Sequence, residues 1–401
     1  MPANPREHSA RLLALVLALL AAALATVAGR AFLVQRRAEL LFPAPGLAGT
    51  FQLSHWHAGL AGTRGDTPVY HFRGATPGGR VLVLGGTHPN EPAGFLAAAL
   101  LVENLRVQQG EVWVLPRANA SAFTATDPQE GTPQQLALAA RDGRPRRFRV
   151  GGRASNPLDQ WPDPEITVHH PSLQALSGIE VRNLNRSYPG RAGGCFTEQV
   201  AWAIRRLVEE ERIDLLVDLH EAAIEYPVVN AIVAHERAGE LAAEAAFTLA
   251  LEGIEISLEP SPKKLHGLSH RELGDAVPGL HATLMETANP GQGRLRGRTD
   301  AAQLIAGRDP CYLAAQGIAG MNKVAVDSSG LPLILRVGRH LDGLKALTLA
   351  LGTLRPDKAV AYEGPPTLAE LRSSGFAPWL APQIEESNPQ ITQITQIGNK
   401  K

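Results

Sequence analysis

The feature that most constrains the fold is a set of short apolar runs that alternate with helix-like segments. RVLVLGG at 80–86, IDLLVDL at 213–219 and LHATLME at 280–286 are typical of buried strands. Segments at 92–105 and 197–212 lie between them and have helical patterns. Strands that alternate with helices predict an α/β fold, with a mostly parallel or mixed sheet and helices on both faces.

Weaker patterns complete the expected domain. They predict further strands at 111–116, 228–234 and 254–258, and helices at 236–251 and 338–351. The 39 basic and 39 acidic residues cancel, so the charge does not indicate a nucleic-acid partner. The chain has only two cysteines, which are either ordinary thiols or, in an exported domain, one bridge: Cys195 and Cys311.

An uncharged stretch rich in Leu and Ala runs from Leu12 to Gly29, about the minimum length that spans a bilayer as a helix. It predicts either an uncleaved membrane anchor or a signal peptide, since Ala23-Leu24-Ala25 offers small residues at the cleavage spacing. Flanking charges are balanced and do not decide the orientation. We expect an anchor with the catalytic domain outside the cytoplasm, in the periplasm; a cytoplasm-facing domain and a secreted one are the alternatives.

Three regions are therefore expected. Residues 1–42 form the hydrophobic anchor or signal segment, 43–355 the catalytic domain, and 356–401 a C-terminal extension with a disordered end. Residues 126–180 are rich in Pro, Gly and Arg and predict a long surface insertion. Its six arginines from Arg141 to Arg153 fit either a solvated loop or a site for an anionic substrate group.

Residues suited to bind a metal follow three of the predicted strands. His88 and Glu91 lie in the turn after the first strand, His220 directly follows IDLLVDL, and Glu286 ends LHATLME. The carboxyl ends of strands in an open α/β sheet form the active site. Two His and one Glu are a ligand set of catalytic zinc sites, which keep a position open for water. We therefore expect one Zn²⁺ per chain, held by His88, Glu91 and His220, with Glu286 as general base.

Several neighbouring polar residues have two interpretations. Asp218 is expected on the same side of its strand as His220, either orienting an imidazole or bound to backbone, and Glu221 is expected to point away. Asn185 and Arg186 fit a carboxylate-binding pair or a loop brace. Four other histidines are not assigned to the site; the first two are expected at the surface: His266, His270, His169 and His170.

Four motifs, GGTHPNEPAG, NLNRSYPG, DLLVDLHEA and TLMETANPG, resemble in this order the succinylglutamate desuccinylase/aspartoacylase family of zinc carboxypeptidase-like deacylases. The resemblance covers about Val69–Pro290. It implies the same zinc ligands and the same catalytic glutamate, and it implies that Asn185 and Arg186 hold the substrate carboxylate. The chain departs from the family at Pro89, where a glycine is usual, and it lacks the second arginine before the Asn–Arg pair; Arg182 is expected to substitute for it.

The expected reaction is hydrolysis of the amide bond of an N-acyl amino acid or a related carboxylate-bearing substrate. Zinc would activate water and polarise the carbonyl, and Glu286 would transfer the proton to the leaving amine. The first alternative is a metallocarboxypeptidase or amidase acting on peptides, including cell-wall peptides. The second is a membrane-tethered binding protein that has kept the fold without catalysis.

Overall fold

The computed structural model describes residues 5–37, 39–126 and 131–383. The expected disordered tail lies outside them. The chain divides into two units, Met1–Glu39 and Leu40–Lys401. The first unit holds helix α1 (Pro5–Gln35), whose span from His8 to Gln35 is long and apolar enough to cross a membrane. A signal sequence passes the same test, so both predicted roles of this segment stand.

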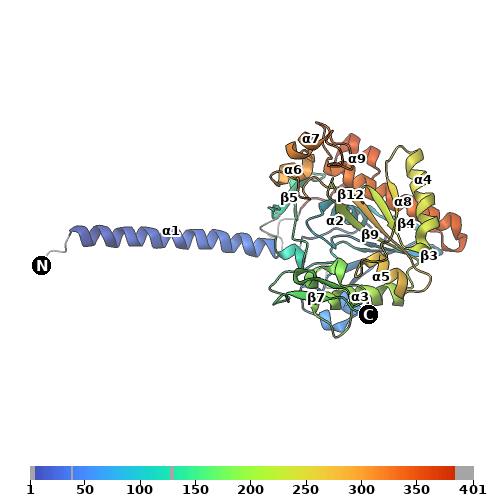
Figure 1. Cartoon of the computed structure of the whole chain (residues 1–401), viewed down its shortest axis with the longest axis horizontal. Coiled ribbons are helices and arrows are strands. Elements are labelled where there is room, and N and C mark those ends of the chain that lie inside the picture. The colour runs from blue at the N-terminus through green and yellow to red at the C-terminus, as the bar shows by residue number, and fades with distance from the viewer. Residues whose placement is uncertain (1–4, 38, 127–130, 384–401) are drawn as a thin grey trace. The chain divides into compact units, whose positions relative to one another are not determined.

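The second unit is built on a nine-stranded mixed sheet with the order β1-β2-β4-β3-β9-β12-β10-β11. Figure 1 labels β3, β4, β9 and β12 of this sheet. Neighbouring strands are parallel for β4-β3-β9-β12 and for β10-β11, and antiparallel elsewhere; β13 pairs with β4. The strands of this sheet are Leu47–Gln52, Pro68–Arg73, Thr76–Leu84, Arg106–Leu115, Leu215–Ala222, Ala231–Ala234, Ser257–Pro260, His281–Ala288 and Ala361–Glu363, for β1, β2, β3, β4, β9, β10, β11, β12 and β13.

Helices cover both faces of this sheet, as the sequence predicts. One face carries α2 (Pro92–Asn104), α4 (Gly239–Leu251) and α8 (Leu333–Leu354), and the other carries α3 (Phe196–Glu210) and α5 (Ser269–Ala276). The side chains of a strand alternate between the two faces and so divide between two cores. In β9, Leu215, Val217 and Leu219 belong to the first core and Leu216 to the second. The α/β architecture is confirmed.

The predicted helices and strands form within a few residues of their expected bounds. The sequence patterns missed the antiparallel strands β1 and β2 at one end of the sheet and three short helices, α6 (Ala301–Ala306), α7 (Pro310–Ala315) and α9 (Leu368–Ser374). Short elements have too few residues to develop a clear apolar period. Part of the predicted C-terminal extension packs on this unit, through β13 and α9.

The 126–180 insertion is more ordered than a solvated loop. It forms two small hairpins, β5-β6 and β7-β8, with strands Gln135–Ala139, Pro145–Arg149, Ile166–Val168 and Ala175–Ser177. Leu136 and Phe148 join the main core. Arg146 is buried and pairs with Glu103 at 2.6 Å. The interpretation as a solvated loop is therefore wrong for this arginine, because β6 points its side chain inward.

Candidate active site

Strand periodicity places the polar residues of β9. The strand continues past its predicted end, so His220 and Glu221 lie within it. Asp218 and His220 are two residues apart and face the same side, as predicted, whereas Glu221 faces α8. The Glu221 carboxylate binds the Arg336 guanidinium at 2.5 Å and the Ala93 N–H at 2.8 Å. Glu221 is thus directed away from the imidazole of its neighbour.

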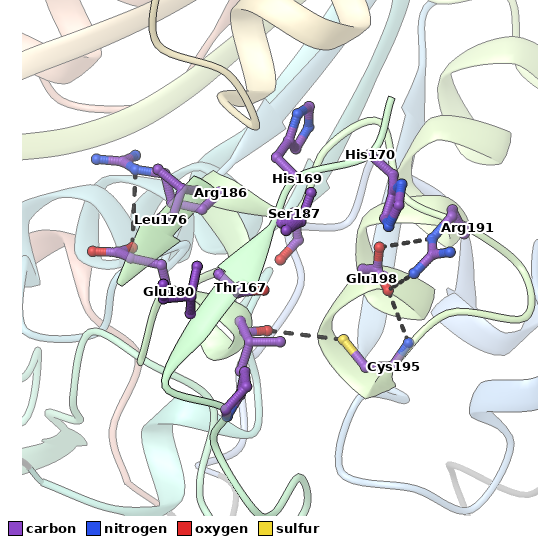
Figure 2. A pocket seen from close by; sticks show the side chains of 14 residues that line it. Thr167, His169, His170, Leu176, Glu180, Arg186, Ser187, Arg191, Cys195 and Glu198 are labelled. Carbon is purple, nitrogen blue, oxygen red and sulfur yellow. Dashed lines mark hydrogen bonds and ion pairs between the residues drawn. The ribbon is translucent and has the colours of Figure 1, made fainter. Parts of the chain in front are cut away.

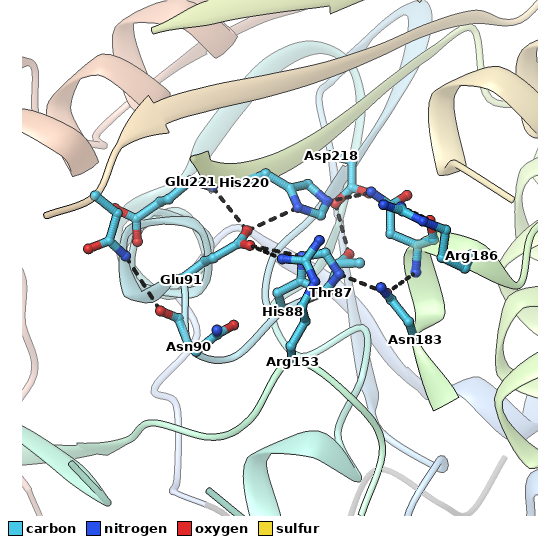
Figure 3. Close-up of polar contacts among 12 residues, drawn as sticks. Thr87, His88, Asn90, Glu91, Arg153, Asn183, Arg186, Asp218, His220 and Glu221 are labelled. Carbon is cyan, nitrogen blue, oxygen red and sulfur yellow. Dashed lines mark hydrogen bonds and ion pairs between the residues drawn. The ribbon is translucent and has the colours of Figure 1, made fainter. Parts of the chain in front are cut away.

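His88, Glu91 and His220 converge at the carboxyl ends of β3 and β9 (Figure 3). The three side chains are buried, and one potential ligand atom from each lies within 4.8 Å of the others. The Glu91 carboxylate lies between the two imidazoles, with Oε1 at 2.9 Å from His88 Nδ1 and Oε2 at 3.0 Å from His220 Nδ1. Residues far apart in sequence thus present two nitrogens and a carboxylate to one point.

The opposite nitrogen of each imidazole also faces an oxygen. His88 Nε2 lies 2.8 Å from Asn183 Oδ1, and His220 Nε2 lies 3.0 Å from Asp218 Oδ2. Asp218 in turn accepts hydrogen bonds from Thr87 Oγ1 at 2.8 Å and from Ser269 Oγ at 2.5 Å. Such partners orient metal-binding imidazoles and leave Nδ1 of each ring directed at the common point. Asn183 has no sequence signal of its own that predicts this contact.

The charges of this cluster depend on one another. Burial, followed by the nearby Arg153, lowers the pKa of His88 to about 4. Burial acts against the protonation of His220, but Asp218 and Glu91 raise the pKa of this imidazole well above its usual value. Burial would also raise the pKa of Glu91, and the two imidazoles instead hold it well below its ordinary range. Glu91 is therefore an ionised carboxylate between the two imidazoles.

Glu286 reaches the cluster from the neighbouring strand. In the parallel β9-β12 pair it is in register with His220, so the two side chains lie side by side on the same face. Burial, followed by the field of nearby Glu91, raises the pKa of the Glu286 carboxyl to about 8, against the opposing effect of His220. Its Oε2 has no hydrogen-bond partner among the described residues. The carboxyl is thus free to exchange a proton with a bound molecule.

These residues line one cavity of about 760 Å³. Its wall includes all three predicted ligands and Glu286, together with Asn185 and Arg186 of the short helix η5 (Leu184–Arg186). Asn185 Oδ1 accepts from the Ser269 N–H at 2.9 Å, and Arg186 Nη1 donates to the Asn185 carbonyl at 2.7 Å. Six of the seven predicted site residues therefore share one cavity.

Arg182 is the exception. Its guanidinium donates to both oxygens of Asp163, at 2.6 and 2.7 Å, and to the Ser155 carbonyl at 2.5 Å. It is not part of the cavity wall. Arg153 of the insertion lines the cavity instead, with Nη1 at 3.1 Å from Glu91 Oε1 (Figure 3). The only sequence signal for Arg153 is its place at the end of the arginine-rich run.

The unassigned histidines occupy different surroundings. His270, expected at the surface, is buried in the cavity wall, and neither ring nitrogen has a hydrogen-bond partner among the described residues. That expectation is wrong, because α5 turns this face toward β9 and β12. His266 is half-buried and meets Glu272 at 2.8 Å. His169 and His170 line a second cavity of about 300 Å³, which shares the Arg186 wall with the first (Figure 2).

The residues present fit a zinc ion. Two imidazole nitrogens and a carboxylate are a known zinc donor set. The opposite nitrogen of each imidazole faces an oxygen that orients the ring, and the cavity leaves one side of the cluster open. Cys195 and Cys311 are free thiols and lie outside this cluster. His88, Glu91 and His220 are thus the residues that would hold the metal.

No protein-family model and no curated protein matches the sequence. Solved structures are similar in fold. The chain resembles succinylglutamate desuccinylase/aspartoacylase structures. One is product-bound ectoine utilization protein EutE (DoeB) from Ruegeria pomeroyi, at 18% identity over 72% of this chain and 61% of that one, with a TM-score of 0.39.

A second is an aspartoacylase family protein from Mesorhizobium loti, at 19% identity over 56% of each chain, with a TM-score of 0.35. The cell shape determinant protein Csd4 from Helicobacter pylori is also similar, at 13% identity over 75% of this chain and 56% of that one, with a TM-score of 0.42. The chain spans about six tenths of the length of these solved proteins. They include members of the family that the sequence motifs resemble.

Proposed function

We propose that this chain is a zinc-dependent hydrolase that cleaves the amide bond of an N-acyl amino acid or a related carboxylate-bearing substrate. The observation that carries the proposal is the unpaired Glu286 carboxyl beside the buried His88, Glu91 and His220 donors. When bound, zinc would supply Lewis acidity that lowers the pKa of water and polarises the scissile carbonyl.

The chain's own residues then have distinct tasks. Asn185 and Arg186 bind the substrate carboxylate, because a guanidinium beside an amide offers several directed donors. This contact holds the amide carbon near Glu286 and so reduces the entropic cost of the reaction. Beside the positive charge of a bound zinc the Glu286 carboxyl would be ionised, and its Oε2 then accepts a proton from water as the water oxygen bonds to the carbonyl carbon. It returns that proton to the amide nitrogen as the C–N bond breaks, which releases an acid and an amine.

Arg153 supplies the cation that the sequence analysis assigned to Arg182. Its side chain is 42% exposed and comes within 3.1 Å of Glu91, so it can move toward the carbonyl oxygen of a bound substrate. A guanidinium directed at the oxygen where negative charge develops stabilises the transition state. Arg182 is held by Asp163 and braces the insertion.

Two variants test the reaction in the full-length protein. Glu286→Gln should retain about one zinc per chain, measured by elemental analysis without chelator, and should lose turnover of N-acyl amino acids by several orders of magnitude. His220→Ala should lose the metal. Glu252→Gln, an exposed glutamate on the far end of α4, is the control. Turnover by Glu286→Gln within tenfold of wild type refutes its role, and a metal-free wild type favours a non-catalytic binding protein.

Peptide hydrolysis is the second candidate. The cavity of about 760 Å³ is larger than an N-acetyl amino acid needs, and the second cavity adjoins it at Arg186 and Glu180. Short peptides therefore belong in the substrate panel, and faster turnover of peptides than of N-acyl amino acids would favour a carboxypeptidase. We also propose that α1 anchors the chain with the catalytic unit outside the cytoplasm; protease accessibility in intact cells tests this orientation.

A further inference from the structure

One wall of the active-site cavity is apolar. Leu284 lies two residues before Glu286 in β12 and therefore faces the same side of the sheet. Its antiparallel neighbour in β10 is Val233, while Ala231 is the neighbour of Glu286 itself. All three are buried and pack together, and half-buried Val228 packs against them. The surface next to the catalytic carboxyl thus holds no polar side chain of β10.

The last residue of β11 and the segment between β11 and α5 extend this wall. Pro260, Pro262, Leu265 and Leu268 all line the same cavity. Leu265 is half-buried and Leu268 is buried. Both present carbon atoms to the cavity. Together with Leu284, Val233 and Val228 they form what we call the apolar wall.

The cationic side chains of the cavity come from other segments. Arg153 belongs to the insertion, Arg186 to η5, and Arg294 and Arg296 to the loop after β12. The cavity therefore has a polar part, which holds these arginines together with Glu180 and Glu225, and an apolar part suited to a hydrocarbon chain. A carboxylate placed against the apolar wall would lose hydration without gaining a hydrogen-bond partner.

The position of Glu286 indicates which half of the substrate the apolar wall contacts. Because this carboxyl must return a proton to the leaving nitrogen, the surface beside it on β12 and β10 contacts the amine-bearing half. We propose that the apolar wall binds the side chain of the released amino acid, so that substrates with an aliphatic or aromatic residue at this position are selected over acidic ones. This inference rests on the proposed function and specifies its substrate class.

Binding of matched probes tests it without turnover. N-acetyl-L-leucine, N-acetyl-L-glutamine and N-acetyl-L-glutamate have side chains of similar length and differ in polarity and charge. Calorimetric titration of full-length, zinc-loaded Glu286→Gln should give at least about tenfold tighter binding of the leucine probe than of the glutamate probe, since a mismatch in an apolar pocket costs tenfold or more. Equal or tighter binding of the glutamate probe, or no binding of any probe, overturns the proposal.

Variants locate the preference on the wall. Val228→Arg and, separately, Leu265→Arg replace half-buried residues that tolerate a long side chain, and each should reduce the preference for leucine about tenfold. Leu258→Arg is the matched control, because Leu258 lies on the edge strand β11, is 40% exposed and is not part of the cavity. An unchanged preference in both folded wall variants counts against the assignment.

Turnover by wild type separates the two proposals. If none of these probes or short peptides is hydrolysed while the leucine preference in binding persists, the proposed reaction fails and the apolar pocket stands. If hydrolysis occurs and glutamate is the preferred residue, the reaction stands and the apolar pocket is refuted.

Discussion

Replacing the two candidate arginines separately distinguishes a catalytic from a structural cation. Arg153→Ala removes a partly exposed guanidinium whose one acidic partner among the described residues is Glu91. Glu91 keeps its contacts with both imidazoles in this variant, so the cost to stability should be small. Arg182→Ala instead leaves Asp163 and the Ser155 carbonyl without their donor.

Arg153→Ala should reduce mainly kcat, whereas Arg182→Ala should reduce mainly the free energy of unfolding. Loss of one donor to the developing oxyanion lowers kcat by roughly 10²–10³-fold, or about 3–4 kcal/mol, so Arg153→Ala should fold normally and turn over slowly. Loss of one partner of a buried pair costs about 3–5 kcal/mol. Arg182→Ala should lie near the lower end of that range, because Asp163 is 19% exposed.

The assay pairs urea unfolding with steady-state kinetics on the same preparations. Arg153→Lys serves as a second variant, since it keeps the charge and loses the forked geometry, and it should recover part of the kcat. The assignment is refuted if Arg153→Ala keeps kcat within fivefold of wild type. A stable Arg182→Ala whose kcat falls a hundredfold would return the role to Arg182.

Three further predictions concern the support of the site. Arg336→Met should lower the free energy of unfolding by about 3–5 kcal/mol, because it leaves the buried Glu221 carboxylate without its ion-pair partner. In urea titrations the double variant Glu221→Gln/Arg336→Met should lose less stability than the sum of the two single variants. Additive losses would contradict this coupling. Asn183→Ala should weaken zinc affinity about 10–100-fold, read by competition with a chromophoric chelator, because His88 Nε2 loses its partner. Burial lowers the pKa of His340 to about 3, so this imidazole stays neutral in the folded protein, whereas the unfolded chain takes up its proton below about pH 6.5; stability therefore falls as the pH drops through this window. Between pH 6.5 and 5 the His340→Gln variant should lose about 2 kcal/mol less than wild type, and identical pH profiles would exclude the effect.

Sequence patterns alone predict the central sheet and the convergence of His88, Glu91 and His220. The strands that hold the site are buried over their apolar runs, so these runs stand out in the sequence. The alternation of side chains places Asp218 with His220 and turns Glu221 away. His88 and Glu91 are three residues apart in one turn, which makes their convergence a local property. A motif within one turn can therefore be recognised without knowledge of the rest of the fold.

The groups that complete the cavity meet through the packing of distant segments. Arg153 lies in the insertion and Arg182 directly follows it, and no sequence pattern distinguishes them; the path of the backbone directs Arg153 toward Glu91 and Arg182 toward Asp163. His270 enters the wall because α5 packs on β12. The apolar wall joins segments whose meeting depends on strand order, since the antiparallel β10 brings Val233 beside Leu284. Contacts between distant segments follow from packing and register, which local sequence patterns do not encode.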